Sequence, residues 1–200
     1  PLDALDVMKE RSNICNYLYI PLQHGSSRML QLMRRGTTRE KTEQLLDTIR
    51  MKIPDIAIRT TMIVGHPGET KEDFDDLLDF IEKSRFDRLG VFGYSHEENT
   101  HSHTMKDDVP AETRQDRLEA VMELQQTISH ELNQSRIGKT YKVLVDRKEG
   151  DTFVGRTEHD TPEVDNEVII RTTNYLRIGD FVNVKISGAT EFDLMGSVVG

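Results

Sequence analysis

Cysteine is nearly absent from this chain of 200 residues, in which Cys15 is the single thiol. One cysteine excludes a disulfide framework. It also excludes any iron–sulfur or zinc site built from several thiolates of this chain alone.

Long apolar runs and signal sequences are missing as well. No stretch approaches the roughly 20 residues that a membrane-spanning helix requires. The basic, apolar and small-residue order of a secretory signal is also absent. These absences predict a cytoplasmic protein without a membrane segment. The chain starts at Pro1 without an initiator methionine, from which we expect a piece of a longer protein.

Positive charge is in the minority. Lysine and arginine together number 26, against 35 aspartates and glutamates, which gives a net charge of −9. A general nucleic-acid binder normally carries a basic face. The composition therefore argues against nucleic acid as a partner and leaves only a local basic patch open.

The strongest local pattern that is present lies between Arg59 and Thr70. A β-branched, apolar run from Ile56 to Val64 predicts a buried strand, and the glycines and proline at 65–68 predict a turn. Thr70 predicts the N-cap of the following helix. Ligands bind at the carboxyl ends of such strands in α/β proteins. An ordinary βα connection has the same pattern, so these residues alone leave both interpretations open.

Strand-like and helix-like segments alternate before residue 136. Strands are expected at Tyr17–Ile20, where Pro21 should end the strand, at 56–64 and at 88–94, each followed by a helix. This order predicts parallel strands with right-handed crossovers. Three strands alone would leave unpaired edges, so we expect part of a larger sheet or barrel.

The hydrophobic period changes from helical to alternating after Gly138. Five short strands are expected at 141–145, 152–157, 168–170, 181–186 and 194–199. Such a series predicts a small, closed, antiparallel β-barrel of the OB-like type. The expected domains are residues 1–136 and 137–200.

Several polar residues are candidates for a site. His24 and His66 each follow a predicted strand, so they should face the same end of the sheet, either as loop residues or as the floor of a site. Arg59 begins an apolar strand, where a lone charge needs a partner. A cofactor carboxylate and a neighbouring acid such as Asp55 or Asp87 are both open.

The loop between residues 95 and 108 is acidic and rich in histidine. Its histidines are His96, His101 and His103, with Glu97 and Glu98 nearby. Zinc sites usually hold their ligands on rigid elements at tighter, paired spacings. A solvated acidic loop is therefore favoured over a metal site.

Four motifs, in order, resemble those of the radical S-adenosylmethionine methylthiotransferases. They are Pro21–Ser26 (PLQHGS), Met33–Gly36 (MRRG), Ile63–Thr70 (IVGHPGET) and Phe92–Ser95 (FGYS). The segment after Gly138 resembles the TRAM domain of that family, so the likeness covers essentially the whole chain. It implies the carboxyl-terminal half of an incomplete TIM-like (βα) barrel followed by a TRAM domain.

Within the family, the chain is most similar to the branch that modifies an aspartate of a ribosomal protein (RimO type). His24 and His66 stand where the tRNA-modifying branch (MiaB type) typically has serine and phenylalanine. From Gly138 onward, eight basic residues face eleven acidic ones, a net charge of −3. A barrel that grips tRNA should be basic, whereas an acidic one suits a basic protein. A tRNA methylthiotransferase and a non-catalytic ribosomal-protein-binding fragment remain the alternatives.

The resemblance also implies the chemistry and partners of the intact enzyme. The substrate would be an aspartate of small-subunit ribosomal protein S-twelve, methylthiolated at its β-carbon after a 5′-deoxyadenosyl radical removes hydrogen. S-adenosylmethionine, two [4Fe-4S] clusters and an electron donor protein would be required. The cluster cysteines are absent here and are expected in an amino-terminal part, so no catalytic or metal-binding residue is assigned to this chain.

This chain would then form one wall of the S-adenosylmethionine pocket. The expected cofactor-binding residues are Gln23, Arg59, Ile63, Val64, Gly65, Phe92 and Tyr94. By position, Gln23 would bind the ribose or methionyl end and Arg59 the methionyl carboxylate. The others would lie against adenine, Gly65 allowing close backbone approach. The expected substrate-docking residues are His96, Glu97 and Glu98, whereas Glu69 should hold its turn or cap its helix.

Overall fold

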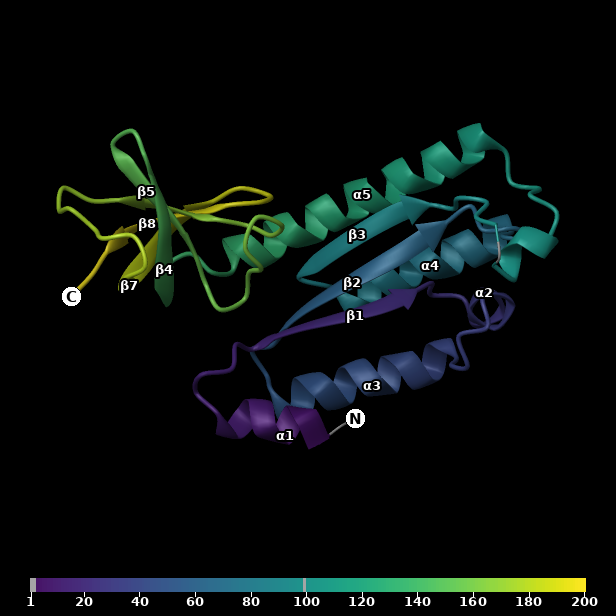
Figure 1. Ribbon diagram of the computed structural model, residues 1–200, viewed down its shortest axis with the longest axis horizontal. Helices are drawn as coiled ribbons and strands as arrows, with labels where there is room; N and C mark the ends of the chain where they lie inside the picture. Colours follow the sequence, from purple (N-terminus) through teal and green to yellow (C-terminus); the bar gives the residue numbers. More distant parts are fainter. Residues whose placement is uncertain (1–2, 99) are drawn as a thin grey trace. The chain divides into compact units, whose positions relative to one another are not determined.

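The computed structural model describes residues 3–98 and 100–200 and contains two compact units (Figure 1). The sheet unit comprises residues 18–54 and 58–125. The barrel unit comprises the residues up to 17 together with 55–57 and 126–200. Among the described helices, none is both long enough and apolar enough to cross a membrane.

Three strands alternate with helices in the first part of the chain. The elements are α1 Asp3–Glu10, β1 Tyr17–Gln23, α2 Ser27–Leu32, α3 Arg39–Lys52, β2 Ala57–Val64, α4 Lys71–Ser84, β3 Arg88–Gly93, the 3₁₀ turn η1 Ser102–Thr104 and α5 Ala111–Gln134. The sheet order is β1-β2-β3, and β2 runs parallel to β3 with Ile63 opposite Phe92. The prediction of parallel (βα) units is confirmed.

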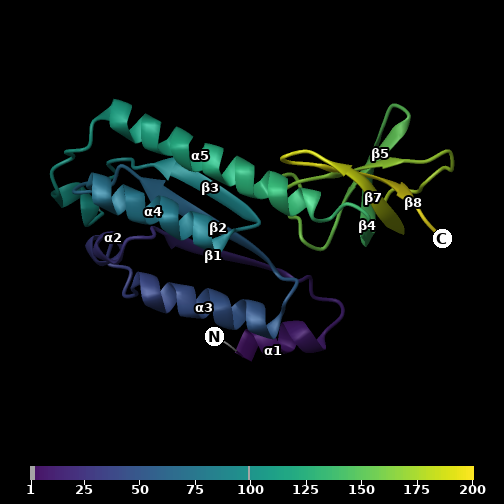
Figure 2. The same cartoon turned by 180° about the vertical axis from the view of Figure 1, so that it is seen from behind.

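The two faces of the sheet differ in what covers them. Helix α4 lies across one face, as the view from behind shows (Figure 2). Side chains of β2 alternate, so Met62 and Val64 are fully buried on this closed face while Thr61 and Ile63 are only half-buried on the other. On that open face Tyr19 is 52% exposed and Phe92 is 61% exposed. The closed face is therefore packed as a buried hydrophobic core, whereas the open face leaves large side chains exposed.

One local prediction about the first elements needs correction. Pro21 does not end the first strand, because β1 continues to Gln23. Since β1 is an edge strand of the described sheet, a missing N–H there costs little. Helix α3 is capped by Thr38, whose side chain accepts a hydrogen bond from the Lys41 amide.

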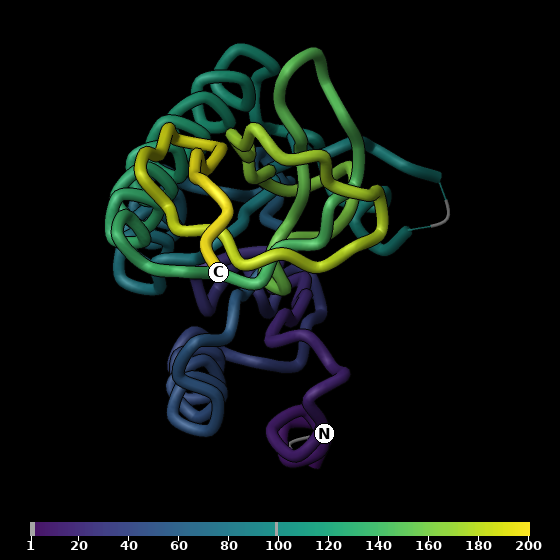
Figure 3. Tube along the Cα trace, turned by 90° about the vertical axis from the view of Figure 1, so that its left-hand side faces the viewer, coloured from purple at the N-terminus to yellow at the C-terminus, as the bar shows by residue number. Residues whose placement is uncertain are grey.

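The second part of the chain is a closed five-stranded barrel (Figure 3). Its strands are β4 Thr140–Glu149, β5 Thr152–Arg156, β6 Val168–Arg171, β7 Phe181–Ala189 and β8 Leu194–Val198. The barrel order is β4-β5-β6-β8-β7. The prediction of a small closed barrel is confirmed, but the expectation of purely antiparallel pairing is wrong, because β6 and β8 pair in parallel.

Inward side chains fill the barrel completely. Val143, Val168, Ile170 and Val184 have no exposed surface. Alternation along each strand produces this, since every second residue points inward. The interior has no free volume for a side chain at Gly155, because a Cβ there would lie 2.3 Å from the Leu144 carbonyl oxygen.

The end of α5 belongs to the barrel unit. Ser129 Oγ donates to the Glu191 carbonyl at 2.6 Å, and Asn133 Nδ2 donates to the Thr190 carbonyl at 3.1 Å. These bonds satisfy carbonyl groups in the β7–β8 connection, which would otherwise lack partners under the helix. The domain boundary between residues 136 and 137 stays a prediction.

Candidate cofactor site at the carboxyl ends of the strands

The turn between β2 and α4 is held by the buried carboxylate of Glu69. Its Oε2 accepts from the Gly65 amide at 2.5 Å and from the His66 amide at 3.2 Å. Its Oε1 accepts from Arg117 of α5 at 2.9 Å. Burial raises the pKa of Glu69, whereas the Arg117 charge and the amide bonds act against that shift. Glu69 therefore holds the turn, as expected from the sequence.

Gly65 lies in the left-handed region, with φ of 74°. A Cβ at this position would lie 2.3 Å from Cγ of Arg114. Arg114 in turn donates to the Tyr94 carbonyl at 2.7 Å and to Asp107 at 2.9 Å. The close approach that Gly65 permits in this structure is thus made by Arg114, which ties α5 to the end of β3.

A second buried carboxylate fastens the start of α4 to the loop after β1. Thr70 is the N-cap of α4, as predicted, and Asp73 completes a capping box with it. The Asp73 carboxylate also accepts from Ser26 Oγ at 2.7 Å and from Arg28. Burial alone would raise the pKa of Asp73. The hydrogen bonds from Arg28, Thr70 and Ser26 outweigh burial and hold that pKa well below its usual range.

His24 is fully buried beneath the β2–α4 turn. Its Nδ1 accepts from the Ser26 amide at 2.9 Å, and its Nε2 lies 4.0 Å from Glu69 Oε2. Burial lowers the pKa of His24 to about 3, so the ring is neutral at physiological pH. His24 supports the loop and is not among the lining residues of the cavity described below.

His66 connects the turn to the loop of residues 95–108. Its Nε2 lies 2.8 Å from Ser102 Oγ, and its Nδ1 lies 3.0 Å from the Pro67 carbonyl oxygen. A second tie is made by Asp108, which accepts from the Gly68 amide at 2.8 Å. The loop is therefore anchored at two points to the carboxyl end of β2.

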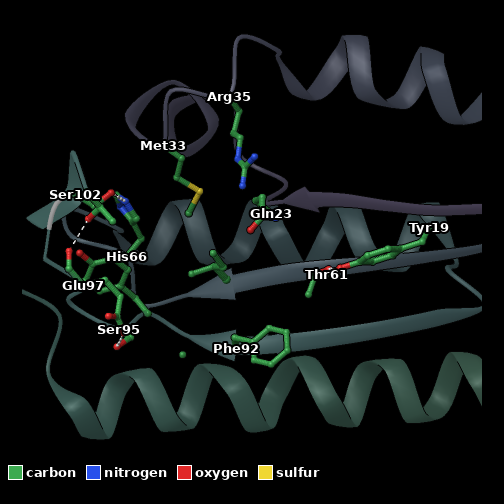
Figure 4. A pocket seen from close by; sticks show the side chains of 14 residues that line it. Tyr19, Gln23, Met33, Arg35, Thr61, His66, Phe92, Ser95, Glu97 and Ser102 are labelled. Carbon is green, nitrogen blue, oxygen red and sulfur yellow. Dashed lines mark hydrogen bonds between the residues drawn. The ribbon is translucent and has the colours of Figure 1, made fainter. Parts of the chain in front are cut away.

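A cavity of about 490 Å³ opens where the turn, the loop and the strand ends meet (Figure 4). It is lined by Tyr19, Gln23, Met33, Arg35, Thr61, Ile63, His66, Phe92, Gly93, Tyr94, Ser95, Glu97, Thr100 and Ser102. All of them belong to the sheet unit. The lining combines apolar and aromatic side chains with several hydroxyl groups, one amide group, one imidazole and one residue of each charge. Small-molecule sites commonly have this composition and size.

Four of the seven expected cofactor-binding residues line the cavity, namely Gln23, Ile63, Phe92 and Tyr94. Gln23 is 9% exposed and has φ of 76°. A non-glycine residue in this region costs of order 1 kcal/mol and persists only where its surroundings enforce it. This residue ends β1 and turns the chain into the loop that carries His24.

The other three expected residues lie differently. Arg59 is on the open face but nearer the start of β2, with its guanidinium carbon 5.9 Å from the centre of the Tyr19 ring. The Val64 side chain points to the closed face and is fully buried, so it forms no wall of the cavity. Strand alternation reverses the direction of this side chain relative to Ile63, and the expected place of Val64 against adenine stays a prediction. The Gly65 position is occupied on one side by Arg114.

The three expected docking residues have different surroundings, and their docking role stays a prediction. Glu97 lines the cavity and accepts from Ser95 Oγ at 2.6 Å. His96 Nδ1 lies 3.2 Å from the Tyr94 hydroxyl, and the exposed Glu98 is not part of the lining.

The residues that the structure describes also offer no donor set for a metal ion or cluster. Across residues 3–98 and 100–200, no group of three or more His, Cys, Asp or Glu side chains could hold a metal ion. Cys15 is exposed in the segment before β1. The described residues therefore do not fit an iron–sulfur cluster, but the cavity does fit an adenosyl compound, which needs an apolar slot and a few hydrogen-bonding groups.

Sequence reasoning missed several lining residues, namely Tyr19, Met33, Arg35, Thr61 and Ser102. Arg35 lies within the motif Met33–Gly36, but it was not assigned a role from the sequence. Arg114 and Arg117 were missed because they lie on α5, far along the chain from the turn that they hold.

Comparison with known proteins agrees with this arrangement. The radical SAM superfamily profile matches residues 1–81, and the TRAM domain profile matches residues 137–199. Curated proteins named "Ribosomal protein uS12 methylthiotransferase RimO" are 64% identical over 200 residues in Cytophaga hutchinsonii, 55% over 197 in Christiangramia forsetii and 49% over 201 in Pelodictyon phaeoclathratiforme.

These matches cover 100%, 98% and 100% of this chain but only 46%, 44% and 47% of those proteins. The chain thus spans about half the length of the curated relatives that it matches. By sequence it belongs to the radical S-adenosylmethionine methylthiotransferases, in which it corresponds to the carboxyl-terminal portion of the RimO type.

Proposed function

We propose that this chain is part of an enzyme that methylthiolates the β-carbon of an aspartate in ribosomal protein uS12. The observation that carries the proposal is the 64% identity to a uS12 methylthiotransferase. The matched span is all 200 residues, so the cavity lies within it. Fold alone would not carry it, because one fold hosts many functions.

In this proposal the cavity holds S-adenosylmethionine against the open face of the sheet. When bound, this cofactor supplies the radical chemistry and the methyl group. Ile63 and Phe92 provide apolar surface for the adenine, and Gln23 offers amide groups to the ribose or the methionyl end. The loop of residues 95–108 shields this end of the sheet from water. Arg59 remains the proposed partner of the methionyl carboxylate.

The clusters and the electron donor are assigned elsewhere. Because the described residues offer no cluster ligands, we place both [4Fe-4S] clusters in the portion of the full-length protein that this chain does not include. The role of this chain is then to orient and enclose S-adenosylmethionine and to dock the ribosomal protein.

The barrel is proposed to dock the ribosomal protein. Its net charge of −3 suits a basic protein better than phosphate. We place the reaction in the cytoplasm, where ribosomal proteins are made and assembled. The tRNA reaction of the related branch is the competing function.

Mass spectrometry of a deletion strain tests the proposal. Removal of the gene should leave uS12 with an unmodified aspartate, while tRNA methylthiolation stays at its wild-type level. Loss of the tRNA modification with normal uS12 would assign the chain to the other branch. Complementation by the full-length gene is the control for effects on neighbouring genes.

A further inference from the structure

Arg35 is a charged lining residue of the cavity to which the proposed function assigns no role. Within the described residues it is the one lysine or arginine that lines the cavity. Most arginines of the sheet unit have acidic or carbonyl partners, such as Arg39 with Glu43 and Arg114 with Asp107. Arg35 forms no side-chain hydrogen bond or ion pair with the part of the chain that the structure describes.

The backbone directs Arg35 toward the cavity. Both neighbours have left-handed backbones, with φ of 56° at Arg34 and 62° at Gly36, and the Arg35 amide donates to the Leu30 carbonyl at 2.9 Å. This turn closes α2 and reverses the chain. Figure 4 shows the resulting guanidinium beside Gln23, above the open face of the sheet.

The cavity has an electrostatic direction. Arg35 approaches from the end of α2, whereas Glu97 approaches from the loop after β3 (Figure 4). An anion in this cavity is attracted toward Arg35 and repelled from Glu97. A carboxylate that leaves water needs such a partner.

We propose that Arg35 binds a carboxylate in this cavity, and that this carboxylate is the side chain of the substrate aspartate. The inference rests on the proposed function. In the aspartate, the reacting β-carbon is bonded directly to the carboxylate carbon. A two-pronged guanidinium–carboxylate contact fixes the plane of the carboxylate and therefore positions the β-carbon one bond away. Arg35 is a specificity and positioning residue, and the methionyl carboxylate of S-adenosylmethionine is the competing source of the same chemistry.

Binding measurements on the full-length protein, loaded with its clusters and S-adenosylmethionine, test the assignment. The two probes are uS12 and a uS12 variant with asparagine in place of the modified aspartate. The unaltered protein should prefer the aspartate form by about 10-fold, since a hydrogen bond between charged groups is worth that much. Arg35→Gln should abolish the preference, and Arg35→Lys should retain part of it because only the point charge survives.

Arg34→Gln is the matched control. It removes the same charge at the adjacent position, and the Arg34 side chain does not line the cavity. It should keep the full preference. Affinity for S-adenosylmethionine, measured by equilibrium dialysis, should be unchanged in Arg35→Gln. A loss of that affinity would assign Arg35 to the methionyl carboxylate instead, and an unchanged preference for aspartate would overturn the proposal.

The same samples separate this inference from the proposed function. Mass spectrometry first establishes that the unaltered protein methylthiolates uS12. If it does and Arg35→Gln behaves identically, only the role of Arg35 is wrong. If it does not, the proposed function fails and the assignment of the substrate carboxylate fails with it.

Discussion

The barrel and the three-stranded sheet differ in how completely their strands are paired and their faces are buried. In the barrel every strand has two paired neighbours, and the interior is filled by side chains such as Val143 and Ile170 without exposure. In the sheet only the closed face is filled, while Tyr19 and Phe92 are more than half exposed on the open face. Large apolar side chains gathered on an exposed face mark a binding surface. The filled barrel interior leaves no room for a ligand, and the open face of the sheet is where we propose that the cofactor binds.

The largest expected effect comes from the buried ion pair under the sheet's carboxyl edge. Glu69→Ala would leave Arg117 buried without its partner and two turn amides without acceptors. We expect a loss of about 3–5 kcal/mol in the free energy of unfolding of the sheet unit. Hydrogen exchange should show a loss of protection in β2 and α4 and unchanged protection in the barrel strands. Glu82→Ala, at an exposed position of α4, is the control, and equal loss in the barrel would show that the two regions are not independent.

The converse change acts on the barrel. Gly155→Ala places a Cβ 2.3 Å from the Leu144 carbonyl oxygen, where backbone must move. We expect a cost of about 1–3 kcal/mol, confined to the barrel strands. Peptide-resolved hydrogen exchange checks this, with Asn183→Ala on the outer surface as the comparison. Unchanged protection in β4 and β5 would show that the barrel is less tightly packed than its geometry implies.

A pH effect should distinguish the sheet from the barrel. The pKa of His24 falls from an ordinary value of 6.5 to about 3 through burial, so the unfolded chain binds the proton first. Stability is therefore full above pH 6.5 and declines as pH falls toward 3, by about 1.4 kcal/mol for each pH unit.

His24→Asn is the diagnostic variant for that slope. Its side-chain oxygen can still accept from the Ser26 amide, but it does not titrate. The decline in β2 and α4 protection between pH 6.5 and 4.5 should be shallower than in the unaltered protein. An identical slope would assign the acid sensitivity to other groups, such as Asp73.

The smallest effect on stability is expected on the open face. Phe92→Ser should change the free energy of unfolding by no more than about 0.5 kcal/mol, because the ring is already 61% exposed. Phe80→Ala on the closed face should cost about 3–5 kcal/mol. Denaturant titration compares the two variants. A large loss for Phe92→Ser would mean that the open face is core in this protein and not a binding surface.

Local pattern was sufficient for most of the fold. Alternating residues predicted the strands, and Thr70 predicted the start of α4, because each depends on neighbours within a few residues. The parallel pairing of β6 with β8 was not predictable in that way, since barrel closure joins residues 26 positions apart, as Val168 with Leu194. Pro21 was misjudged because its cost depends on lying in an edge strand, which sequence does not state.

The site was predicted in part for the same reason. Motif position placed Gln23, Ile63 and Phe92 near the cavity, since strand ends can be located from sequence. The direction of each side chain could not be located so well, which is why Val64 was included. The roles of Arg35 and Arg114 depend on a chain reversal and on a distant helix, and these appear only in three dimensions.

Hydrogen exchange of the full-length protein with and without S-adenosylmethionine tests the central claim most directly. We expect the cofactor to slow exchange in residues 59–65 and 88–95 and to leave exchange in the barrel strands from Thr140 to Val198 unchanged. Slower exchange in the barrel strands together with unchanged exchange in the sheet would contradict the claim that the open face of the sheet binds the cofactor.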